Sequence, residues 1–515
     1  MFCKSCGARV KAFLVIAAVA LLAGGWSEGA ARAPLGRWRQ KQGQNNEVAT
    51  PGKSEGEPRR QSETDKPAKA GGLWNRFAGR KGPYGSTSTK STVELKNVPG
   101  TARTAILRGK YLGGGVLYGD ATTERAVLKA LRWLKATQAP DGSWGPKPEL
   151  GLTKSMDKAA GAGFAVLTFL AHGETPASEE FGLTVEKAIN YLVNSVYVVK
   201  DRSGNKARDP NGNTPYVKMR GAGGAEYGFL IATYALCEAY AMTKDPNVRA
   251  AAELALGRII SGQTPTGGWN YNMKRMPSEG APDDISFGGW AMQALKAGKM
   301  AGIHLPGMEE CIKKAVKCLK TRNYSEKAGF VYRATTNHKG GFGGLGGVGC
   351  LGMQMFGYAH EPEVANALRV MSTWSPTFDK KHMSGGANAQ YYSYYAAQCK
   401  YQAGMARSAT PANLALWKKW NAEMKALYPK TIITVMDPKT NKPYTISDAQ
   451  GRPCEIGHWV NGDAFSYDVM GTCLTALQLM VYYRYLPTTQ LTVSNVDKDV
   501  GPRNDSGKGN IAVGI

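Results

Sequence analysis

Residues 283–295 decide the fold and read Asp283-Asp284-Ile285-Ser286-Phe287-Gly288-Gly289-Trp290-Ala291-Met292-Gln293-Ala294-Leu295. Two carboxylates stand where a helix would begin, because Asp accepts hydrogen bonds from first-turn amides and favours the positive end of the helix dipole. Apolar side chains then recur every three or four residues, and two consecutive glycines are tolerable only where another backbone packs closely. The stretch therefore predicts a buried helix whose polar start points at a cavity.

This helix is one unit of a pattern that occurs six times between residues 121 and 490. An amphipathic stretch is followed by a stretch that is apolar on every side, as in residues 124–136 and 162–171. Helices with one charged face belong outside and helices apolar all round belong inside. We therefore predict an all-α fold, an (α/α)6 toroid of two concentric helical rings. The alternative is an open superhelix of helix pairs, which would leave the apolar helices lining a wet concave face.

Two segments interrupt the repeat. Residues 200–224 form a polar loop within the second pair. In the sixth pair, two β-branched runs, residues 431–435 and 444–446, flank a turn at residues 437–441, which predicts a small β-hairpin insertion.

The first 120 residues differ in composition from the rest. Three basic residues precede an apolar run at residues 12–23, which is typical of a secretory signal and short for a membrane span. We expect residues 1–31 to be a signal peptide or an uncleaved anchor. Residues 32–120 are rich in Gly, Pro, Ser and Lys and predict a disordered basic linker, and residues 491–515 a flexible tail. The protein is accordingly expected to be exported to the periplasm, cell envelope or outside the cell.

The formal charge of +25 is unevenly spread, and the 89 residues of this linker, which hold 17 Lys and Arg against 7 Asp and Glu, carry +10 of it. On an exported protein a basic linker favours contact with anionic lipid, glycan or cell wall, and it disfavours nucleic acid as a partner. A linker that is merely soluble explains the charge equally well. Cys3 and Cys6 form a CxxC, but no second pair follows at zinc-ribbon spacing, so no metal and no cofactor are expected. The other seven cysteines are scattered and show no disulfide framework, so at most one or two bridges are expected.

Two loops carry a resemblance. Leu134-x3-Gln138-x3-Gly142-x-Trp144 and the run from Gln263 to Trp269 resemble the Gln-Trp repeat of the terpene cyclase/prenyltransferase (squalene–hopene cyclase-like) α/α-toroid superfamily. The likeness covers about residues 120–490, and the whole chain resembles exported, uncharacterised bacterial members. It implies that Gln138, Trp144, Gln263 and Trp269 are structural, each tying a helix end to its neighbour.

The resemblance also suggests chemistry. Class II terpene cyclases protonate an alkene with an Asp-x-Asp-Asp acid, and residues 281–284 match that motif with Ala281 in place of the first Asp. The match would make Asp283 the proton donor beside Asp284, while simple helix capping by Asp284 is the competing interpretation. The thiolate of the prenyltransferase zinc site is missing at Ile285.

Other polar and aromatic residues are candidates for lining a cavity. They are Trp290, Glu226, Tyr227, Tyr391, Tyr392, Tyr394, His458 and Asp463. Tyrosines can stack on sugars or isoprenoids, although packing between crowded helices is the commoner reason for them. Whether the protein is an enzyme stays open at this point. We expect a ligand-binding or scaffolding module of the cell envelope that contacts an isoprenoid lipid or an anionic glycan. The alternative is an enzyme, either cyclase-like with Asp283 as general acid or a polysaccharide lyase.

Overall fold

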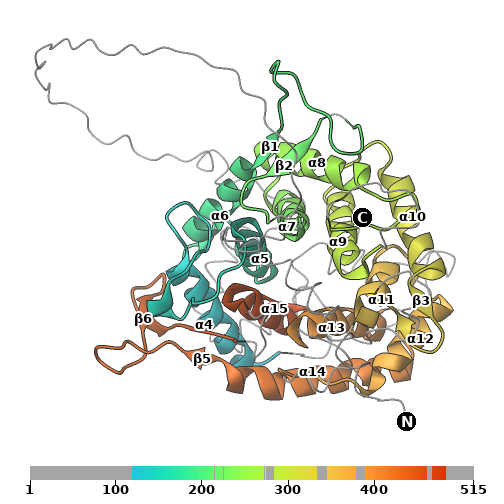
Figure 1. Ribbon diagram of the computed structural model, residues 1–515. Coiled ribbons are helices and arrows are strands. Elements are labelled where there is room, and N and C mark those ends of the chain that lie inside the picture. Colours follow the sequence, from blue (N-terminus) through green and yellow to red (C-terminus); the bar gives the residue numbers. More distant parts are fainter. Residues whose placement is uncertain are drawn as a thin grey trace, which may run out of the picture. The chain divides into compact units, whose positions relative to one another are not determined.

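The computed structural model describes residues 119–482, except residues 214, 224–225, 272, 274–282, 333–344, 379–388, 407 and 461–466. The expected leader, most of the linker and the tail lie outside the described residues. Within them, twelve α-helices alternate between an outer and an inner position (Figure 1). The outer helices are α4 (Ala121–Thr137), α6 (Gly182–Ser195), α8 (Pro246–Ser261), α10 (Met308–Thr321), α12 (Pro362–Val370) and α14 (Pro411–Thr431). The inner helices are α5 (Lys158–Ala171), α7 (Tyr227–Thr243), α9 (Ile285–Met300), α11 (Gly346–Met355), α13 (Ala389–Met405) and α15 (Asp468–Met480).

Both rings close. Each inner helix packs against the inner helices before and after it in the chain, and α15 packs against α5. Outside, α14 packs against α4. An open superhelix would leave its first and last pairs apart, so these contacts confirm the predicted (α/α)6 toroid.

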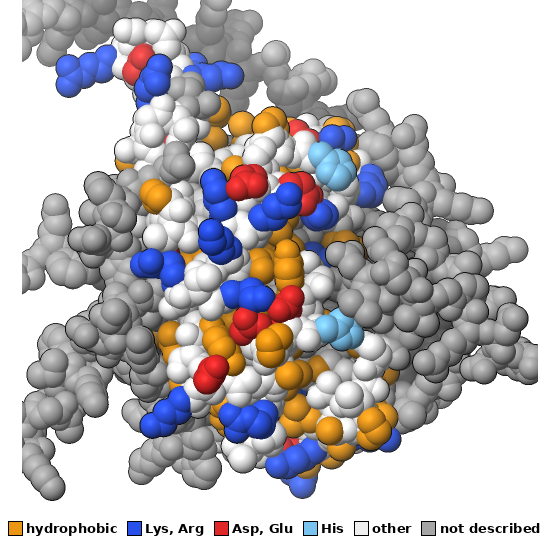
Figure 2. Space-filling model, turned by 90° about the vertical axis from the view of Figure 1, so that its right-hand side faces the viewer, with side chains coloured by type: hydrophobic (Ala, Val, Ile, Leu, Met, Phe, Trp, Pro, Cys, Tyr) orange, Lys and Arg blue, Asp and Glu red, His pale blue; other side chains and the backbone are white. Residues whose placement is uncertain are grey.

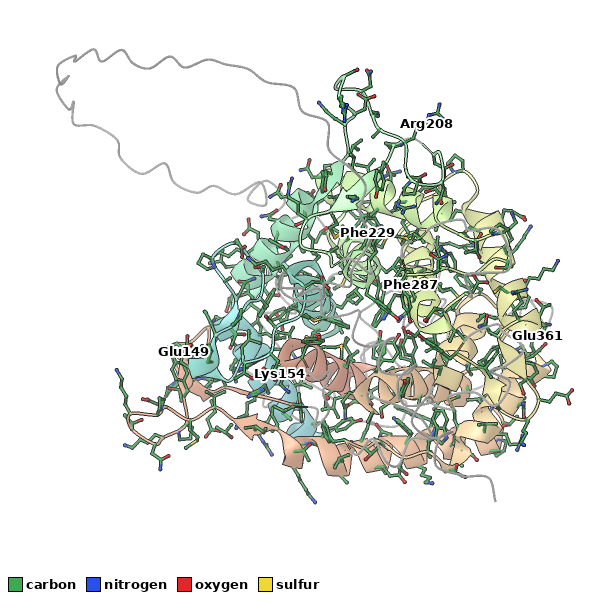
Figure 3. The ribbon with its side chains drawn as sticks, in the orientation of Figure 1. Glu149, Lys154, Arg208, Phe229, Phe287 and Glu361 are labelled. Atoms are coloured by element: carbon green, nitrogen blue, oxygen red, sulfur yellow. The ribbon has the colours of Figure 1, made fainter. Side chains whose placement is uncertain are left out.

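Burial separates the two rings as the pattern predicted. In α7 every residue from Tyr227 to Ala241 is buried, whereas α10 buries one apolar stripe and exposes its Lys and Glu side chains. Viewed from the side of α10 and α12, the surface shows basic side chains interspersed with acidic ones (Figure 2). In Figure 3, Phe229 and Phe287 lie on inner helices and Glu361 lies at the outer rim. None of the described helices is long and apolar enough to span a bilayer.

Short strands accompany the loops. They are β1 (Val196–Val198), β2 (Val217–Met219), β3 (Tyr324–Ser325), β4 (Gly329–Phe330), β5 (Ile433–Thr434), β6 (Thr445–Ser447), β7 (Pro453–Glu455) and β8 (Gly457–His458), and single-turn 3-10 helices occur at η3 (Pro148–Leu150) and η6 (Met371–Thr373). The predicted turn at residues 437–441 is present, and Met436 bridges Pro443 across it. The insertion extends further than expected, however, because β5 pairs with β8 and β6 pairs with β7, both antiparallel.

The Gln-Trp loops connect neighbouring outer helices. The Gln263 amide donates to the carbonyl oxygens of Gly267 and Cys311, each at 2.8 Å, and Cys311 belongs to the next outer helix. The Trp269 indole donates to Ile259 at the end of the preceding outer helix, at 2.9 Å. Gly267 is needed between them, because its φ is +98° and a Cβ would lie 2.3 Å from the Lys314 carbonyl oxygen.

The first copy repeats this geometry. Gln138 donates to Thr184 of α6 at 2.9 Å, and Trp144 donates to Leu134 of α4 at 3.0 Å. A third tryptophan makes the same contact without the motif: Trp459 donates to Tyr428 at the end of α14, at 2.8 Å. The sequence motif does not include Trp459, because the strands β5 to β8 are inserted between this tryptophan and its acceptor. The two residues are 31 positions apart, whereas tryptophan and acceptor are 10 positions apart in the other two copies.

We expect Gln263→Ala to lower the free energy of unfolding by about 1–3 kcal/mol, because two buried carbonyl oxygens lose their donor. Gln138→Ala is the matched control: Gln138 is half-buried and one of its two bonds is long, at 3.3 Å, so a smaller loss is expected. Urea denaturation of the three proteins measures the difference. Equal stability of all three would show that these glutamines do not tie the outer helices.

Candidate functional site

The first turns of α7, α9 and α13 meet in a set of hydroxyl groups that we call the tyrosine cluster. It comprises Tyr227, Tyr271, Tyr332 and Tyr391 together with Ser286 and Asp284. The Tyr227 hydroxyl lies 2.5 Å from Ser286 Oγ, and the Tyr391 hydroxyl donates to the Ser286 carbonyl oxygen at 2.8 Å. Tyr271 and Tyr332 share a hydrogen bond between their hydroxyls. Residues more than one hundred positions apart are thus joined around the start of one helix.

Asp284 is the anion of this cluster and also the cap of α9. Its Oδ1 accepts from the amides of Ser286 at 2.8 Å and Phe287 at 3.1 Å, from an extended backbone. Its carboxylate also hydrogen bonds with the Tyr271 side chain. The capping function is therefore present as expected, and the same carboxylate contributes to the electrostatics of the tyrosines.

Burial holds the tyrosines in their neutral form. It raises the pKa of Tyr227 and of Tyr271 far above the usual value, and the negative charge of Asp284 raises both pKa values further. The pKa of Tyr391 is likewise raised, mainly by burial. At neutral pH these phenols can donate hydrogen bonds and present ring faces, but they cannot serve as bases.

Asp283 lies on the other side of the backbone from Asp284. Its Oδ1 accepts from Thr264 Oγ1 at 2.7 Å, and its Oδ2 accepts from Thr266 and, at 3.6 Å, from the Cys318 thiol. Arg322 Nε lies 4.0 Å from the same oxygen. These partners belong to the Gln263 loop and to the end of α10, so Asp283 joins that loop to the helix behind it.

The space beside both carboxylates is small. A cavity of about 20 Å³ is lined by Trp269, Asp283, Asp284, Met292 and Cys318 among others. That volume holds roughly one water molecule, whereas sites for organic ligands measure about 300–1,000 Å³. A polyprene does not fit beside Asp283 in this arrangement.

Trp290 fills the centre of the inner ring. Its side chain is fully buried, and its ring lies 5.4 Å from Phe164 of α5, 6.4 Å from Tyr234 of α7 and 5.8 Å from Tyr394 of α13. Tyr394 in turn donates to Gln293 at 2.9 Å. Trp290 and Tyr394 therefore pack the ring between the tyrosine cluster and the far ends of the inner helices.

The remaining predicted residues are distributed as follows. Tyr392 packs edge-on against Tyr391, with ring centroids 5.7 Å apart, next to the cluster. Glu226 precedes Tyr227 in the chain, but its carboxylate lies 3.8 Å from Arg258. Burial raises the pKa of Glu226, although the positive charge of Arg258 lowers it in part. His458 lies elsewhere, stacked on Trp133 at 4.9 Å where α4 meets β8, and burial lowers its pKa. Asp463 lies outside the described residues.

Sequence reasoning did not point to Tyr271 and Tyr332 of the cluster, or to the nearby carboxyl of Asp157. Asp157 caps α5, with its Oδ1 accepting from Ala160 at 2.8 Å, and it abuts Gly228 in the first turn of α7. Burial raises its pKa to about 7. The signal was available, because Asp157 precedes an apolar helix as Asp284 does.

No family model and no curated protein matches the chain. Solved structures do match over most of its length. The α-1,6-mannanase GH76A from Salegentibacter sp. HEL1_6 has 10% identity and a TM-score of 0.44, covering 70% of this chain and 98% of that one. A cellobiose 2-epimerase from Bacillus thermoamylovorans B4167 has 12% identity and a TM-score of 0.45, covering 69% and 97%. A type II terpene cyclase from Scytonema has 12% identity and a TM-score of 0.38, covering 72% and 98%. These α/α toroids have three different activities, so the likeness concerns the fold alone.

We expect Asp284→Ala to lower the free energy of unfolding by about 0.5–2 kcal/mol and Asp284→Asn to cost less, since Asn is nearly as good a cap. Asp245→Ala is the matched control, because Asp245 caps α8 through the same two amide bonds and lies outside the cluster. Chemical denaturation measures all three. An Asp284→Ala variant as stable as the parent would contradict the cap.

The raised pKa of Asp157 predicts a pH dependence of stability. An unfolded carboxyl ionises near 4 and the folded one at about 7. Between these values the folded protein holds a proton that the unfolded chain has released, so stability falls as the pH rises from about 4 to about 7. Asp157→Asn keeps the cap and removes the ionisation. From about pH 4 to about pH 7 we expect its free energy of unfolding to fall by roughly 2–4 kcal/mol less than that of the parent. Parallel stability curves for the two proteins would contradict the raised pKa.

Proposed function

We propose that the protein is an exported binding or scaffolding module of the cell envelope that holds a ligand at the tyrosine cluster and does not transform it. The observation that carries this proposal is the placement of the two candidate catalytic carboxylates. Asp283 accepts from Thr264, Thr266 and Cys318, and Asp284 caps α9. A general acid must be free to reach its substrate, and both carboxylates are committed to the fold.

The chemistry of the cluster favours a neutral, hydroxyl-bearing ligand such as a glycan chain. Tyrosine rings and hydroxyls suit sugar faces and edges, and Tyr271 and Glu226 at its border are partly exposed. The members of the tyrosine cluster are tyrosines, a serine and an aspartate, so the cluster itself offers no cationic partner to an anionic ligand. Contact with anionic polymers is a task for the basic linker.

The test is a binding panel with the full chain. Neutral glycans, anionic glycans and a polyprenyl lipid are titrated by calorimetry, and each ligand is analysed afterwards for turnover. We expect a neutral glycan to bind, to be recovered unchanged, and to bind roughly tenfold more weakly to Tyr271→Ala, because the variant loses a ring face and a hydroxyl that the sugar would contact. Tyr444→Ala, which alters an exposed tyrosine in the β5 to β8 insertion, is the control and should bind normally.

An enzyme remains the second candidate, because Asp157 titrates near neutral pH at the same end of the ring. Turnover of any ligand that disappears in Asp157→Asn or Asp283→Asn would overturn the binding proposal and support catalysis. If the polyprenyl lipid were the only ligand of the panel to bind, the result would support the isoprenoid alternative.

Export is the other half of the proposal, supported by the basic start and the apolar run at residues 12–23. Fractionation of cells producing the tagged chain should recover it outside the cytoplasm. A cytoplasmic majority would refute it.

A further inference from the structure

Helices α11 and α13 touch through their backbones. A Cβ on Gly347 of α11 would lie 3.0 Å from the Ala396 amide nitrogen of α13. Both helices run in the same direction, as inner helices separated by an outer return do, so residues three positions further along face each other one turn on. Those residues are Cys350 and Cys399. The next turn is also in contact, because the Gln354 amide donates to the Cys399 carbonyl oxygen at 3.1 Å.

The two thiols are partners in the fold. The Cys399 side chain beside Cys350 contributes to the raised pKa of the Cys350 thiol, and both side chains are fully buried. Cys399 Sγ also donates to the Ala396 carbonyl oxygen at 3.5 Å. The contacts at Gly347 and Gln354 bracket the two cysteines on both sides. A disulfide requires such a close approach of two backbones, with Cα atoms roughly 4.4–6.8 Å apart. The other described cysteines have different neighbours: Cys318 donates to Asp283 and Asn323, and Cys473 lies beside Thr168.

We propose that Cys350 and Cys399 form an intramolecular disulfide in the exported protein. The inference rests on export, since disulfides persist in oxidising compartments. Its structural effect falls on the shortest of the described inner helices. Helix α11 has only 10 residues, four of them glycine, and the bridge would fasten it to α13, whose tyrosines pack on Trp290.

The bond must form while the chain folds. Burial raises the pKa of the Cys350 thiol well above its usual value, so the folded dithiol offers almost no thiolate and reacts slowly. In the reaction, one thiolate attacks a small disulfide oxidant and releases one small thiol, which leaves a mixed disulfide. The second thiolate then attacks the protein sulfur of that mixed disulfide and releases the other small thiol. The two cysteines lose two protons and two electrons, and the oxidant is reduced to two thiols.

The first experiment tests geometry and uses purified full-length chain. It is denatured and reduced, then refolded in a buffer of oxidised and reduced glutathione, treated with an alkylating reagent in denaturant, and mapped by mass spectrometry. We expect peptides containing Cys350 and Cys399 to be cross-linked, and the melting temperature to exceed that of a reduced preparation by several degrees. Cys473→Ala should keep the bridge, whereas Cys350→Ala should leave Cys399 open to alkylation.

The second experiment tests the compartment, by alkylating thiols during extraction from producing cells. We expect the same cross-linked peptides. Alkylation of both cysteines in the refolded protein, or pairing with another cysteine, would overturn the geometric inference and leave the binding proposal standing. A bridge that forms on refolding but is absent from cell extracts would overturn the export on which the proposal rests.

Discussion

The packing of Trp290 across the inner ring is the contact on which the rest of the toroid depends. The side chain belongs to α9, yet it meets Phe164 of α5 and Tyr394 of α13, neither of which adjoins α9 in the ring. Each aromatic pair contributes about 0.5–1.5 kcal/mol beyond the burial of its surface. To bring these rings together, the inner helices must approach closely, which explains the small residues where they cross. A Cβ on Gly289 would lie 2.4 Å from Val348.

Closing a ring of parallel helices also gathers the partial positive charges of the helix starts at one end of the ring. The starts of the inner helices gather at one end, and each presents unpaired amides and the positive end of a helix dipole. Asp157 and Asp284 cap two of these starts, and Asp468 at the start of α15 accepts from the amides of Thr153 and Lys154 at 2.7 and 2.9 Å. The positive end of each helix thus explains the carboxylates at this end of the ring without reference to catalysis. The tyrosines beside Asp284 are not explained in that way, which makes them the better guide to function.

The hydrophobic periodicity of the sequence predicted the structural features that depend on neighbouring residues in the chain. It did not predict the contacts between segments that are far apart in the chain. The six helix pairs and the turn at residues 437–441 were predictable because hydrophobic period and turn residues are local signals. His458 was grouped with the cavity candidates, yet it stacks on Trp133 where the ring closes, a contact between residues 325 positions apart. Trp459 repeats the role of Trp144 and Trp269, but an insertion separates it from its acceptor. Ser286 joins Tyr227 to Tyr391 and carries no sequence signal at all, because its partners lie on other helices.

The opposite placement of Asp283 and Asp284 follows from the backbone itself. Asp284 has φ −108° and ψ 113°, an extended conformation, and consecutive side chains of an extended chain point to opposite sides. One carboxylate therefore reaches the tyrosine cluster, and the other reaches Thr264 and Cys318 behind the helix. Two carboxylates that share a proton must face each other, and adjacent residues in this conformation cannot. The Asp-Asp pair that most resembles an acid catalyst in the sequence thus has two different sets of partners, the helix start and tyrosines for Asp284 and the Gln263 loop and α10 for Asp283.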